Sequence, residues 1–258
     1  MPTLPEPHEL RATAESFGID AQRYDRARPR YPAALIDRLA AAGPKVLDVG
    51  AGTGIVAKQL QDRGNVVLGV EPDERMAEFA RKQNLDVEVA TFETWDANGR
   101  TFDAVVSGQA WHWVDPVKGA EKAAEVLKPG GVLALFWHLF VPPQDIARAF
   151  GEAFTQAVPE SPIKFDGKRV PTPDAYRPLI EKTFTGTDFE EPQRHEYHWH
   201  QNYTRDEYLD LLPTQGGLTR VSEKQRKAVL TAVGAVIDAR GGQFACDYTT
   251  VLFTAVKR

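Results

Sequence analysis

The chain contains almost no cysteine and no long apolar run. Cys246 is the single cysteine among 258 residues, which excludes an intramolecular disulfide framework and a cysteine-rich zinc site and favours a reducing compartment. No segment reaches the roughly 20 apolar residues of a membrane-spanning helix. The opening segment MPTLPEPHEL also lacks the basic and apolar regions of a secretory signal. We therefore expect a cytoplasmic protein that does not interact with membranes.

Positive charge is not in excess either. The 31 Lys and Arg residues are outnumbered by 36 Asp and Glu residues, which gives a formal net charge of −5. Such a balance offers no general attraction for nucleic acid, so no nucleic-acid partner is expected. With 258 residues, 42% of them hydrophobic, the chain can bury the core of one large domain. The sequence leaves open whether this domain is a monomer or a homodimer.

Short apolar segments alternate with helical patterns through residues 43–141. Strands are predicted at residues 45–50, 65–72, 86–92, 102–109 and 132–140, and helices at residues 54–64, 73–84 and 116–131, the last ended by Pro129 and two glycines. Strands separated by helices of this length are joined by right-handed crossovers and form a parallel sheet that is covered on both faces. The predicted fold class is therefore α/β, with a doubly wound, mostly parallel, Rossmann-like sheet.

The segments around this core are less regular. Residues 17–42 are polar and aromatic and then helical, because Pro32 suits the first turn of a helix that stops at Gly43. Residues 142–190 carry many prolines around short helical patterns, and we expect a helical insertion that caps the substrate side. Residues 191–258 contain two alternating strand patterns and two helices. These strands are expected to complete the sheet at one edge, which gives seven strands in a single domain.

The segment KVLDVGAGTG joins a predicted strand to a predicted helix through three glycines. Gly50, Gly52 and Gly54 are spaced G-x-G-x-G, and Glu71 ends the next strand. An acidic side chain at that position can accept hydrogen bonds from both hydroxyls of a ribose. An ordinary tight turn would explain the glycines alone. Together with the second strand, the pattern predicts a nucleotide pocket.

Asp48 indicates which ligand fits this pocket. A carboxylate just before the loop repels a pyrophosphate, which needs bare backbone N–H groups and the positive end of a helix. S-adenosylmethionine carries no phosphate, and its ammonium and sulfonium groups are attracted to a nearby carboxylate. A dinucleotide fold would also have a glycine at the position of Ile55. The sequence therefore favours S-adenosylmethionine over NAD.

Five segments occur in order on these predicted elements: VLDVGAGTG, GVEPDERMAEFAR, VEVATFETW, FDAVVSGQAWHWVDP and VLKPGGVLAL. In this order they resemble the motifs of the class I S-adenosylmethionine-dependent methyltransferases. More narrowly, they resemble the type 11 small-molecule group that includes the trans-aconitate methyltransferase-like enzymes. The resemblance covers about residues 17–140 and the final strand pair. It implies an antiparallel strand at the sheet edge and S-adenosyl-L-methionine as cofactor.

The resemblance also implies cofactor contacts at particular residues. The methionine end would lie at the glycine loop, Glu71 would bind the ribose, and Pro72 and Met76 would lie against the adenine. A threonine, Thr91, stands where an acidic residue usually accepts the adenine amino proton. The residues implied by the motifs are Asp48, Gly50, Ala51, Gly52, Thr53, Gly54, Glu71, Pro72, Met76, Thr91, Phe92, Ser107, Gln109 and Ala110.

The segment YDRARPRYP resembles the N-terminal lid of the same group. The resemblance implies that Tyr24 and Arg28 contact the cofactor and that Tyr31 contacts the substrate, since arginine can bind a carboxylate with two parallel hydrogen bonds. The alternative is the start of a helix in which the aromatic rings pack and the arginines are solvated.

The segment QAWHWVDP follows the fourth predicted strand, where ligands collect in this architecture. Trp111 and Trp113 are candidate substrate contacts. His112, and His138 after the next strand, are candidates for substrate positioning or for a general base. The alternative is that a tryptophan lies in the core and that the histidines are structural. Neither histidine is needed as a base if the nucleophile is a carboxylate, which is already ionised.

The segment HEYHWH contains three of the six histidines. On a strand, Glu196, His198 and His200 share one face, and His195, Tyr197 and Trp199 share the other. Two histidines and a glutamate could bind zinc. A solvated polar face opposite an aromatic face explains the same residues more simply, so no metal is predicted.

The sequence thus predicts a methyltransferase that acts on a small-molecule acceptor, with a carboxylate or hydroxyl oxygen as the favoured acceptor atom. Methylation of nitrogen or carbon remains an alternative. So does a protein that binds S-adenosylmethionine without catalysis and serves in interactions.

Overall fold

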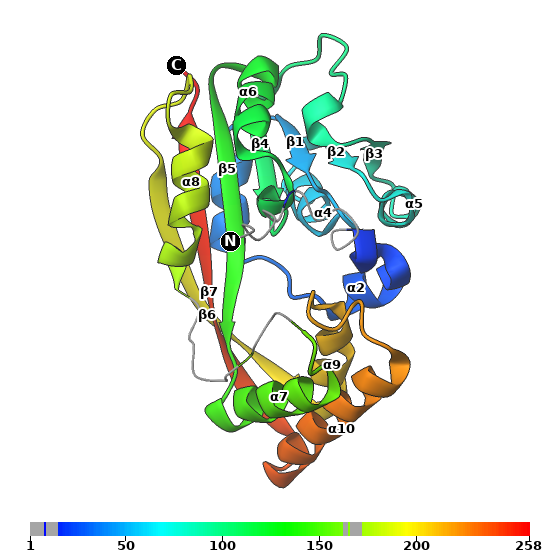
Figure 1. Cartoon of the computed structure of the whole chain (residues 1–258). Helices are drawn as coiled ribbons and strands as arrows, with labels where there is room; N and C mark the ends of the chain where they lie inside the picture. Colours follow the sequence, from blue (N-terminus) through cyan, green and yellow to red (C-terminus); the bar gives the residue numbers. More distant parts are fainter. Residues whose placement is uncertain (1–7, 9–14, 162–164, 166–171) are drawn as a thin grey trace.

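The computed structural model describes residues 8, 15–161, 165 and 172–258 (Figure 1). Within these residues, the chain forms one seven-stranded sheet in the order β3-β2-β1-β4-β5-β7-β6. The strands are β1 (Lys45–Val49), β2 (Val66–Glu71), β3 (Asp86–Val89), β4 (Phe102–Gly108), β5 (Leu127–Val141), β6 (Gln193–Thr204) and β7 (Gln243–Val256). Strands β1 to β5 pair in parallel, whereas β7 is antiparallel to both of its neighbours. The predicted doubly wound, mostly parallel sheet is confirmed, with the antiparallel strand one position inside the edge.

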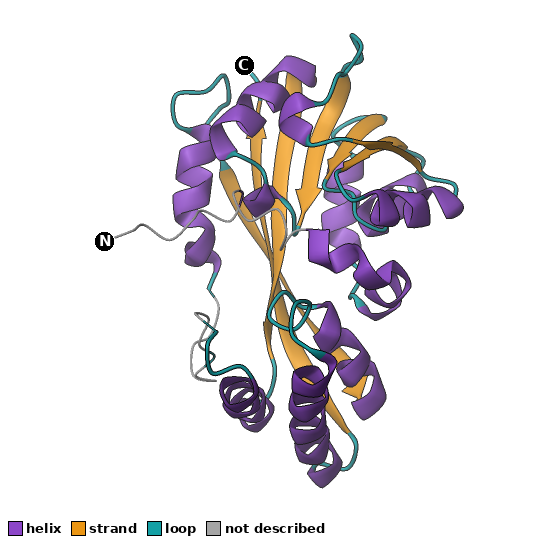
Figure 2. Cartoon of the chain, turned by 45° about the vertical axis from the view of Figure 1, so that its right-hand side comes forward, coloured by secondary structure: helices purple, strands orange, loops and turns teal. Residues whose placement is uncertain are grey.

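Helices cover both faces of this sheet (Figure 2). The α-helices are α2 (Ala21–Ala27), α3 (Ala33–Ala40), α4 (Ile55–Gln61), α5 (Glu74–Lys82), α6 (Pro116–Val126), α7 (Gln144–Ala157), α8 (Arg177–Phe184), α9 (Arg205–Leu211) and α10 (Glu223–Ala239). Short 3-10 helices are η2 (Glu15–Asp20), η3 (Phe92–Thr94), η4 (Trp111–Trp113), η5 (Pro173–Tyr176) and η6 (Leu212–Thr214). One apolar core joins α3, α4 and α5 to the sheet, and another joins α6 and α8 to its opposite face. None of the described helices is long and apolar enough to cross a membrane.

Several predicted boundaries are wrong, among them the ends of α6 and β3. Helix α6 ends at Val126, and Leu127 already belongs to β5. The α conformation is disfavoured for the residue before a proline, so the helix stops well before Pro129. Strand β3 ends at Val89, because Phe92 begins the 3-10 turn η3.

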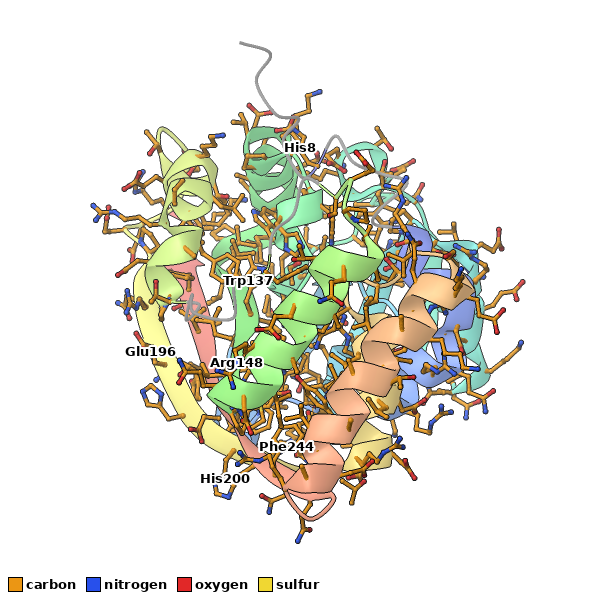
Figure 3. The ribbon with its side chains drawn as sticks, turned by 60° about the horizontal axis from the view of Figure 1, so that its bottom comes forward. His8, Trp137, Arg148, Glu196, His200 and Phe244 are labelled. Carbon is orange, nitrogen blue, oxygen red and sulfur yellow. The ribbon has the colours of Figure 1, made fainter. Side chains whose placement is uncertain are left out.

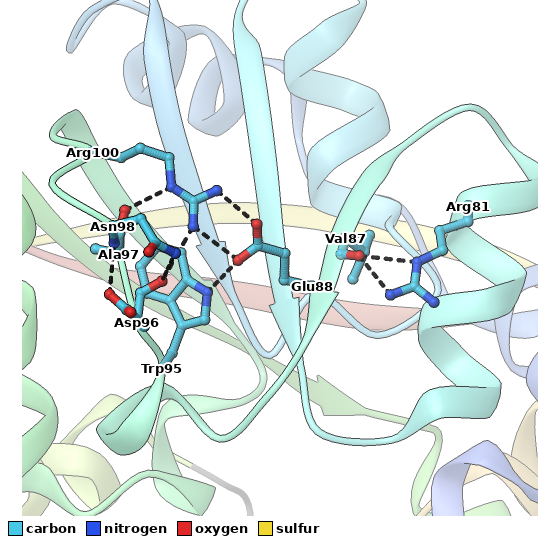
Figure 4. A network of polar contacts seen from close by, with 8 residues as sticks. All are labelled: Arg81, Val87, Glu88, Trp95, Asp96, Ala97, Asn98 and Arg100. Atoms are coloured by element: carbon cyan, nitrogen blue, oxygen red, sulfur yellow. Dashed lines mark hydrogen bonds and ion pairs between the residues drawn. The ribbon is translucent and has the colours of Figure 1, made fainter.

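Glu88 anchors the loop that follows β3. Its carboxylate accepts two hydrogen bonds from the guanidinium of Arg100 and one from the indole nitrogen of Trp95, as Figure 4 shows. Two parallel N–H···O bonds make such an arginine–carboxylate pair geometrically specific. The pair ties residues 95–100 to the sheet and thereby fixes the direction in which Phe92 enters the core.

Strands β5, β6 and β7 continue beyond the other four strands into the lower part of the molecule (Figure 1). Helices α7, α9 and α10 cover them there and form a third apolar core. Segment 142–190 therefore does not form one insertion: α7 packs against α10, whereas α8 packs against α6 beside the sheet. The lower part, which we call the cap, also uses residues 205–244, since the far ends of three strands expose apolar faces that one helix cannot cover.

Helix α8 is held to the sheet core by a buried hydrogen bond. Trp111 Nε1 donates to Thr183 Oγ1 at 3.0 Å, and both side chains are fully buried. The Thr183→Val substitution keeps the shape but leaves the indole N–H without a partner, which costs about 1–3 kcal/mol of unfolding free energy. Urea unfolding at pH 7 measures this loss. The matched Thr94→Val substitution at an exposed threonine should change stability by less than about 0.5 kcal/mol, and equal effects of the two would contradict the assignment.

Candidate functional site

Two adjoining cavities open at the carboxyl ends of β1, β2 and β4, where the strand order reverses and ligands bind in such sheets. The outer cavity, about 180 Å³, is lined by Phe17, Tyr24, Arg28, Gly50, Gly52, Glu71, Pro72, Asp73, Met76, Gly108, Gln109, Ala110, His112 and Trp113. The inner cavity, about 40 Å³, is lined by Tyr24, Arg28, Pro29, Tyr31, Asp48, Gly50, Ala51, Gly52, Thr53, Ile55, Val56, Gly108, Gln109 and His138. Because they share six residues, the cavities form two parts of one site.

The glycine loop brings the ends of β1 and β4 close together. Gly50 has φ +68°, and a Cβ atom there would lie 2.3 Å from the Cβ of Ala110. Gly54 has φ +89°, and a Cβ atom there would lie 2.0 Å from Leu85 Cδ1. Only glycine adopts this left-handed backbone readily without a side chain that clashes. The loop therefore exposes backbone to the site at a place where any side chain would fill it.

Asp48 is a buried carboxylate at the floor of the inner cavity. Its side chain is 1% exposed, and its Oδ2 has no hydrogen-bond partner among the described residues. Burial raises the pKa of Asp48 to about 7; a backbone hydrogen bond from Ala57 opposes the rise, and the charge of Glu71 adds to it. Thr53 Oγ1 beside it likewise has no partner in the described part of the chain. Such groups are costly to bury unless a ligand satisfies them.

Glu71 connects the two loops that bound the outer cavity. Its Oε2 accepts from the backbone N–H of Gly52 and its Oε1 from that of Asp73, each at 2.9 Å. Burial raises the pKa of Glu71 to about 7, although these two backbone hydrogen bonds oppose the rise. The carboxylate is thus held in one orientation and still has lone pairs to offer a ligand.

The N-terminal lid closes the cavities from the side of α2. Phe17 packs against Tyr24 and Trp113, with ring centroids 6.1 and 6.2 Å apart. The guanidinium of Arg28 lies 4.8 Å from the centroid of the Tyr24 ring, and its Nη2 donates to the carbonyl of Thr214 in η6. Arg28 Nε has no partner among the residues that the structure describes.

Two histidines face the site from β5 and η4. His138 stacks on Tyr31 at 4.3 Å, its Nδ1 lies 2.8 Å from Thr250 Oγ1, and its Nε2 has no partner in the described residues. His112 Nδ1 accepts a hydrogen bond from Trp137 Nε1 at 3.2 Å. Burial lowers the pKa of His112 to about 4 and, with the nearby charge of Arg28, that of His138 to about 3. Both rings are therefore neutral near pH 7.

Comparison with known proteins decides which family has this site. A family model described as a methyltransferase domain matches residues 47–135. An uncharacterized methyltransferase of Mycobacterium tuberculosis is 32% identical over 249 residues, which cover 93% of this chain and 95% of the relative. The chain belongs to the class I S-adenosylmethionine-dependent methyltransferases.

Two further methyltransferases show how far the likeness extends. The solved structure of an Anaeromyxobacter dehalogenans protein assigned to the type II methyltransferases has a TM-score of 0.65 and 20% identity, over 88% of this chain and 97% of that one, and so shares the fold. A malonyl-[acyl-carrier protein] O-methyltransferase of Enterobacter lignolyticus is 34% identical over 135 residues, 50% of this chain and 54% of the relative. The narrower trans-aconitate methyltransferase-like group stays a prediction.

The donor set of the site fits S-adenosylmethionine, the cofactor of this methyltransferase family. The unpartnered Asp48 carboxylate can bind the ammonium group, and the oriented Glu71 carboxylate can accept from the ribose hydroxyls. Phe17, Pro72 and Met76 line the outer cavity and can contact the adenine. The structure thus brings together the predicted glycine loop, Glu71, Pro72, Met76, Gln109, Ala110, Tyr24 and Arg28.

Five predicted site residues, Gly54, Thr91, Phe92, Ser107 and Trp111, do not line the cavities of the methyltransferase. Phe92 and Trp111 are buried in the core, where their rings pack 6.1 Å apart, and the loop anchored by Glu88 directs Phe92 there. Ser107 is fully buried and donates to the carbonyl of Val49, so it links β4 to β1. Thr91 precedes Phe92 in the sequence, and its hydroxyl is 2.7 Å from that of Thr94. Gly54 is the N-cap residue of α4, where a Cβ atom would meet Leu85 and not the cavity.

Six lining residues lie outside the predicted set: Phe17, Pro29, Ile55, Val56, Asp73 and Gly108. Phe17 belongs to the predicted lid, but nothing in the sequence shows that it meets Trp113, 96 positions later. Asp73 caps α5 as predicted and also turns toward the site, where a Cβ atom on Gly18 would lie 2.0 Å from its Oδ2. Gly18 and Asp73 are 55 positions apart, so their close contact is visible only in the structure.

Strand β6 shows the predicted alternation in HEYHWH. His195, Tyr197 and Trp199 are half-buried, whereas Glu196, His198 and His200 are exposed. In Figure 3, Glu196 and His200 lie at the outer margin of this strand. Glu196 pairs with Arg194, and His198 Nδ1 lies 3.0 Å from Thr249 Oγ1. Among the described residues there is no cluster of three or more side chains that could hold a metal ion.

Asp48→Asn separates the binding role of this carboxylate from any structural role. Loss of the charge should raise the Kd for S-adenosylmethionine roughly 10- to 100-fold, the loss expected for one charge-assisted hydrogen bond. At pH 8 the ligand-free variant should be as stable as the wild type or more stable, because an uncompensated buried charge is removed. Isothermal titration calorimetry and thermal unfolding measure the two effects. Asp62→Asn, at the exposed partner of Lys58, is the matched control, and an unchanged Kd for Asp48→Asn would refute the assignment.

Affinity and stability should respond to pH in opposite directions. The folded-state pKa values of Asp48 and Glu71 are raised to about 7, so the ligand-free protein should lose stability as pH rises from about 4 to 7. A bound cation favours the ionised carboxylate, so affinity should be full above pH 7 and fall below it, by up to about tenfold per pH unit for each group. Calorimetric titrations and unfolding curves between pH 5.5 and 8 check both trends. Parallel trends would contradict this account.

Proposed function

We propose that this methyltransferase transfers the methyl group of S-adenosylmethionine to an oxygen atom, a carboxylate or a hydroxyl, of a small-molecule acceptor. The observation that carries the proposal is Arg28, whose guanidinium lines both cavities with Nε unpartnered in the described residues. A fixed cation beside the site attracts an anionic acceptor and disfavours a cationic amine. The partial relative from Enterobacter lignolyticus, which is an O-methyltransferase, supports the choice of oxygen.

In this proposal the cofactor spans the two cavities. The glycine loop with Asp48 and Thr53 binds the amino-acid end in the inner cavity, and Glu71 binds the ribose. Pro72 and Met76 lie against the adenine, with Phe17 and Trp113 closing the outer cavity. Gln109 and Ala110 follow β4 at the junction of the cavities, where the sulfonium would lie.

Bound S-adenosylmethionine supplies an electrophilic methyl group on a positively charged sulfur. The protein's part is to hold the acceptor in line with that group and to keep water out, because positioning alone contributes a large share of the rate. The lid supplies both: Tyr24 and Phe17 cover the outer cavity, and Tyr31 walls the inner cavity against His138. Arg28 orients the acceptor or the cofactor carboxylate through its fork of N–H donors.

Two alternatives make different predictions. A nitrogen or carbon acceptor would require a neutral nucleophile that tolerates Arg28. A non-catalytic protein that binds S-adenosylmethionine would show ligand binding and no methyl transfer. The unpartnered Arg28 Nε and His138 Nε2 favour a catalytic site, since they offer hydrogen-bonding capacity beyond the part of the site that fits the cofactor's ammonium and ribose.

Arg28→Met tests the assignment in an acceptor screen that follows production of S-adenosylhomocysteine with carboxylic acids, alcohols, phenols and amines. We expect the wild type to turn over an oxygen acceptor. In Arg28→Met, kcat/KM for that acceptor should fall roughly 10- to 100-fold, because a charged hydrogen-bond donor is lost. Arg177→Met removes an exposed arginine of α8 that pairs with Glu181 and lines neither cavity, and is the matched control. Turnover only with amines, or no turnover at all despite tight cofactor binding, would overturn the proposal.

A further inference from the structure

Each of the two histidines that face the site is connected to a tryptophan indole. Trp137 donates directly to His112, and Trp199 donates to Thr250, which contacts His138. We infer that these contacts place the ring proton of both histidines on Nε2, so that His112 and His138 act as hydrogen-bond donors to an oxygen of the ligand and neither ring removes a proton from the acceptor. The assignment of that ligand to the methyl acceptor rests on the proposed function, whereas the position of the protons does not.

The hydrogen bond from Trp137 determines the tautomer of His112. An indole nitrogen can only donate, so the 3.2 Å contact from Trp137 Nε1 makes His112 Nδ1 the acceptor. Trp137 is fully buried and stacks on Tyr176 at 4.2 Å, so its N–H has no access to water. A neutral imidazole that accepts at Nδ1 carries its proton on Nε2. His112 therefore carries an N–H on Nε2, and its ring lies between the outer cavity and a second cavity beside Tyr176.

The hydroxyl of Thr250 determines the tautomer of His138. Trp199 Nε1 donates to Thr250 Oγ1 at 2.9 Å, and this hydroxyl is fully buried. The hydroxyl proton of Thr250 then needs an acceptor, and among the described residues the one atom within reach is His138 Nδ1 at 2.8 Å. His138 Nδ1 is therefore an acceptor, and Nε2 carries the proton. That N–H has no partner in the described part of the chain, and His138 lines the inner cavity.

The sheet register explains why the second chain of contacts forms. His138 of β5 lies opposite Thr250 of β7, and Thr250 lies opposite Tyr197 of β6, two residues before Trp199. Side chains two residues apart share one face of a strand. The indole, the hydroxyl and the imidazole therefore line up across three neighbouring strands, on the face where Tyr31 stacks on the imidazole. This arrangement restricts rotation of the His138 ring and fixes its tautomer.

The chemical consequence concerns the acceptor group. An Nε2–H donor binds an oxygen lone pair, and a ring whose other nitrogen already accepts a hydrogen bond cannot take a proton without losing that bond. Burial, which lowers the pKa of both rings, acts in the same direction. A carboxylate acceptor then uses a lone pair that it already has: its bond to the methyl carbon forms, the carbon–sulfur bond breaks with its electrons on sulfur, and no proton moves. A hydroxyl acceptor undergoes the same bond changes and loses its proton to water, not to either ring.

Histidine tautomers can be measured directly. In the ¹⁵N-histidine-labelled protein at pH 7, two-bond ¹⁵N–¹H correlation spectra should show unprotonated Nδ1 and protonated Nε2 for both residues, assigned with His112→Gln and His138→Gln. Thr250→Val should release the His138 tautomer, whereas Thr250→Ser, which retains the hydroxyl, should not. Trp137→Phe removes the indole N–H and should release the His112 tautomer. An Nδ1–H tautomer or an imidazolium ring would overturn the inference, whether or not a methyl acceptor has been found.

Turnover tests the role toward the acceptor. His138→Ala and His112→Ala remove the N–H donor and should lower kcat/KM roughly 10- to 100-fold, the effect of one lost hydrogen bond in a dry site. A glutamine amide can place an N–H near the position of histidine Nε2. His138→Gln and His112→Gln should therefore retain most of the wild-type kcat/KM. A general base would leave the glutamine variants as inactive as the alanine variants, and this result overturns the donor role. An effect of the His138 variants confined to the Kd of S-adenosylmethionine overturns the assignment to the acceptor.

Discussion

The structure is organised around a buried carboxylate, Asp48, that forms no ion pair with any residue that the structure describes. Asp48 lies at the end of β1 in the middle of the sheet, where its carboxylate is removed from water and where neighbouring strands prevent it from moving. An isolated carboxylate in such a place is unfavourable, and the rise of its pKa to about 7 expresses this cost. A cationic ligand relieves it. The ligand-free protein is therefore less stable at neutral pH than its core would allow, and part of the binding free energy comes from the removal of this destabilisation.

The long pairing of β5 with β7 joins the two parts of the molecule. β4 last pairs with β5 at Phe136, and from Trp137 to Val141 the strand is held on one side by β7 alone. His138 lies just past this point, beyond the end of β4 and opposite Thr250. The same stretch leads directly to α7 and the cap. The residue that meets the ligand is thus positioned by the strand pair that also carries the cap helices, so cap and site share one framework.

Much of the cofactor side could be predicted from the sequence, because it is local. The glycines, Asp48 and Glu71 lie on consecutive strand–turn–helix units, so their spacing along the chain determines their spacing in space. Thr91, Phe92 and Trp111 were misplaced for a related reason. The sequence indicates which turn a residue occupies but not which face of the turn it is on, and here Glu88 and the core of α6 and α8 decide that. Phe17 and the contacts of His138 depend on residues about 100 positions away, and no local pattern reveals them.

This difference between local and distant contacts also divides the site by role. Contacts that suit the cofactor come from β1, β2 and the loops after them, whereas Arg28, His112 and His138 are held by η6, β7 and the tryptophans. Asp210 of α9 pairs with Arg23 and Arg26 of α2 at 3.0 and 2.7 Å, and Arg28 donates to Thr214 directly after α9. The lid is therefore fastened to the cap at Arg23, Arg26 and Arg28, while the backbone of Tyr31 exchanges two hydrogen bonds with the side chain of Gln59 in α4. A substitution in the cap can shift Arg28 and the acceptor's surroundings while Asp48 and Glu71 keep their positions, so the choice of acceptor can change without loss of the cofactor.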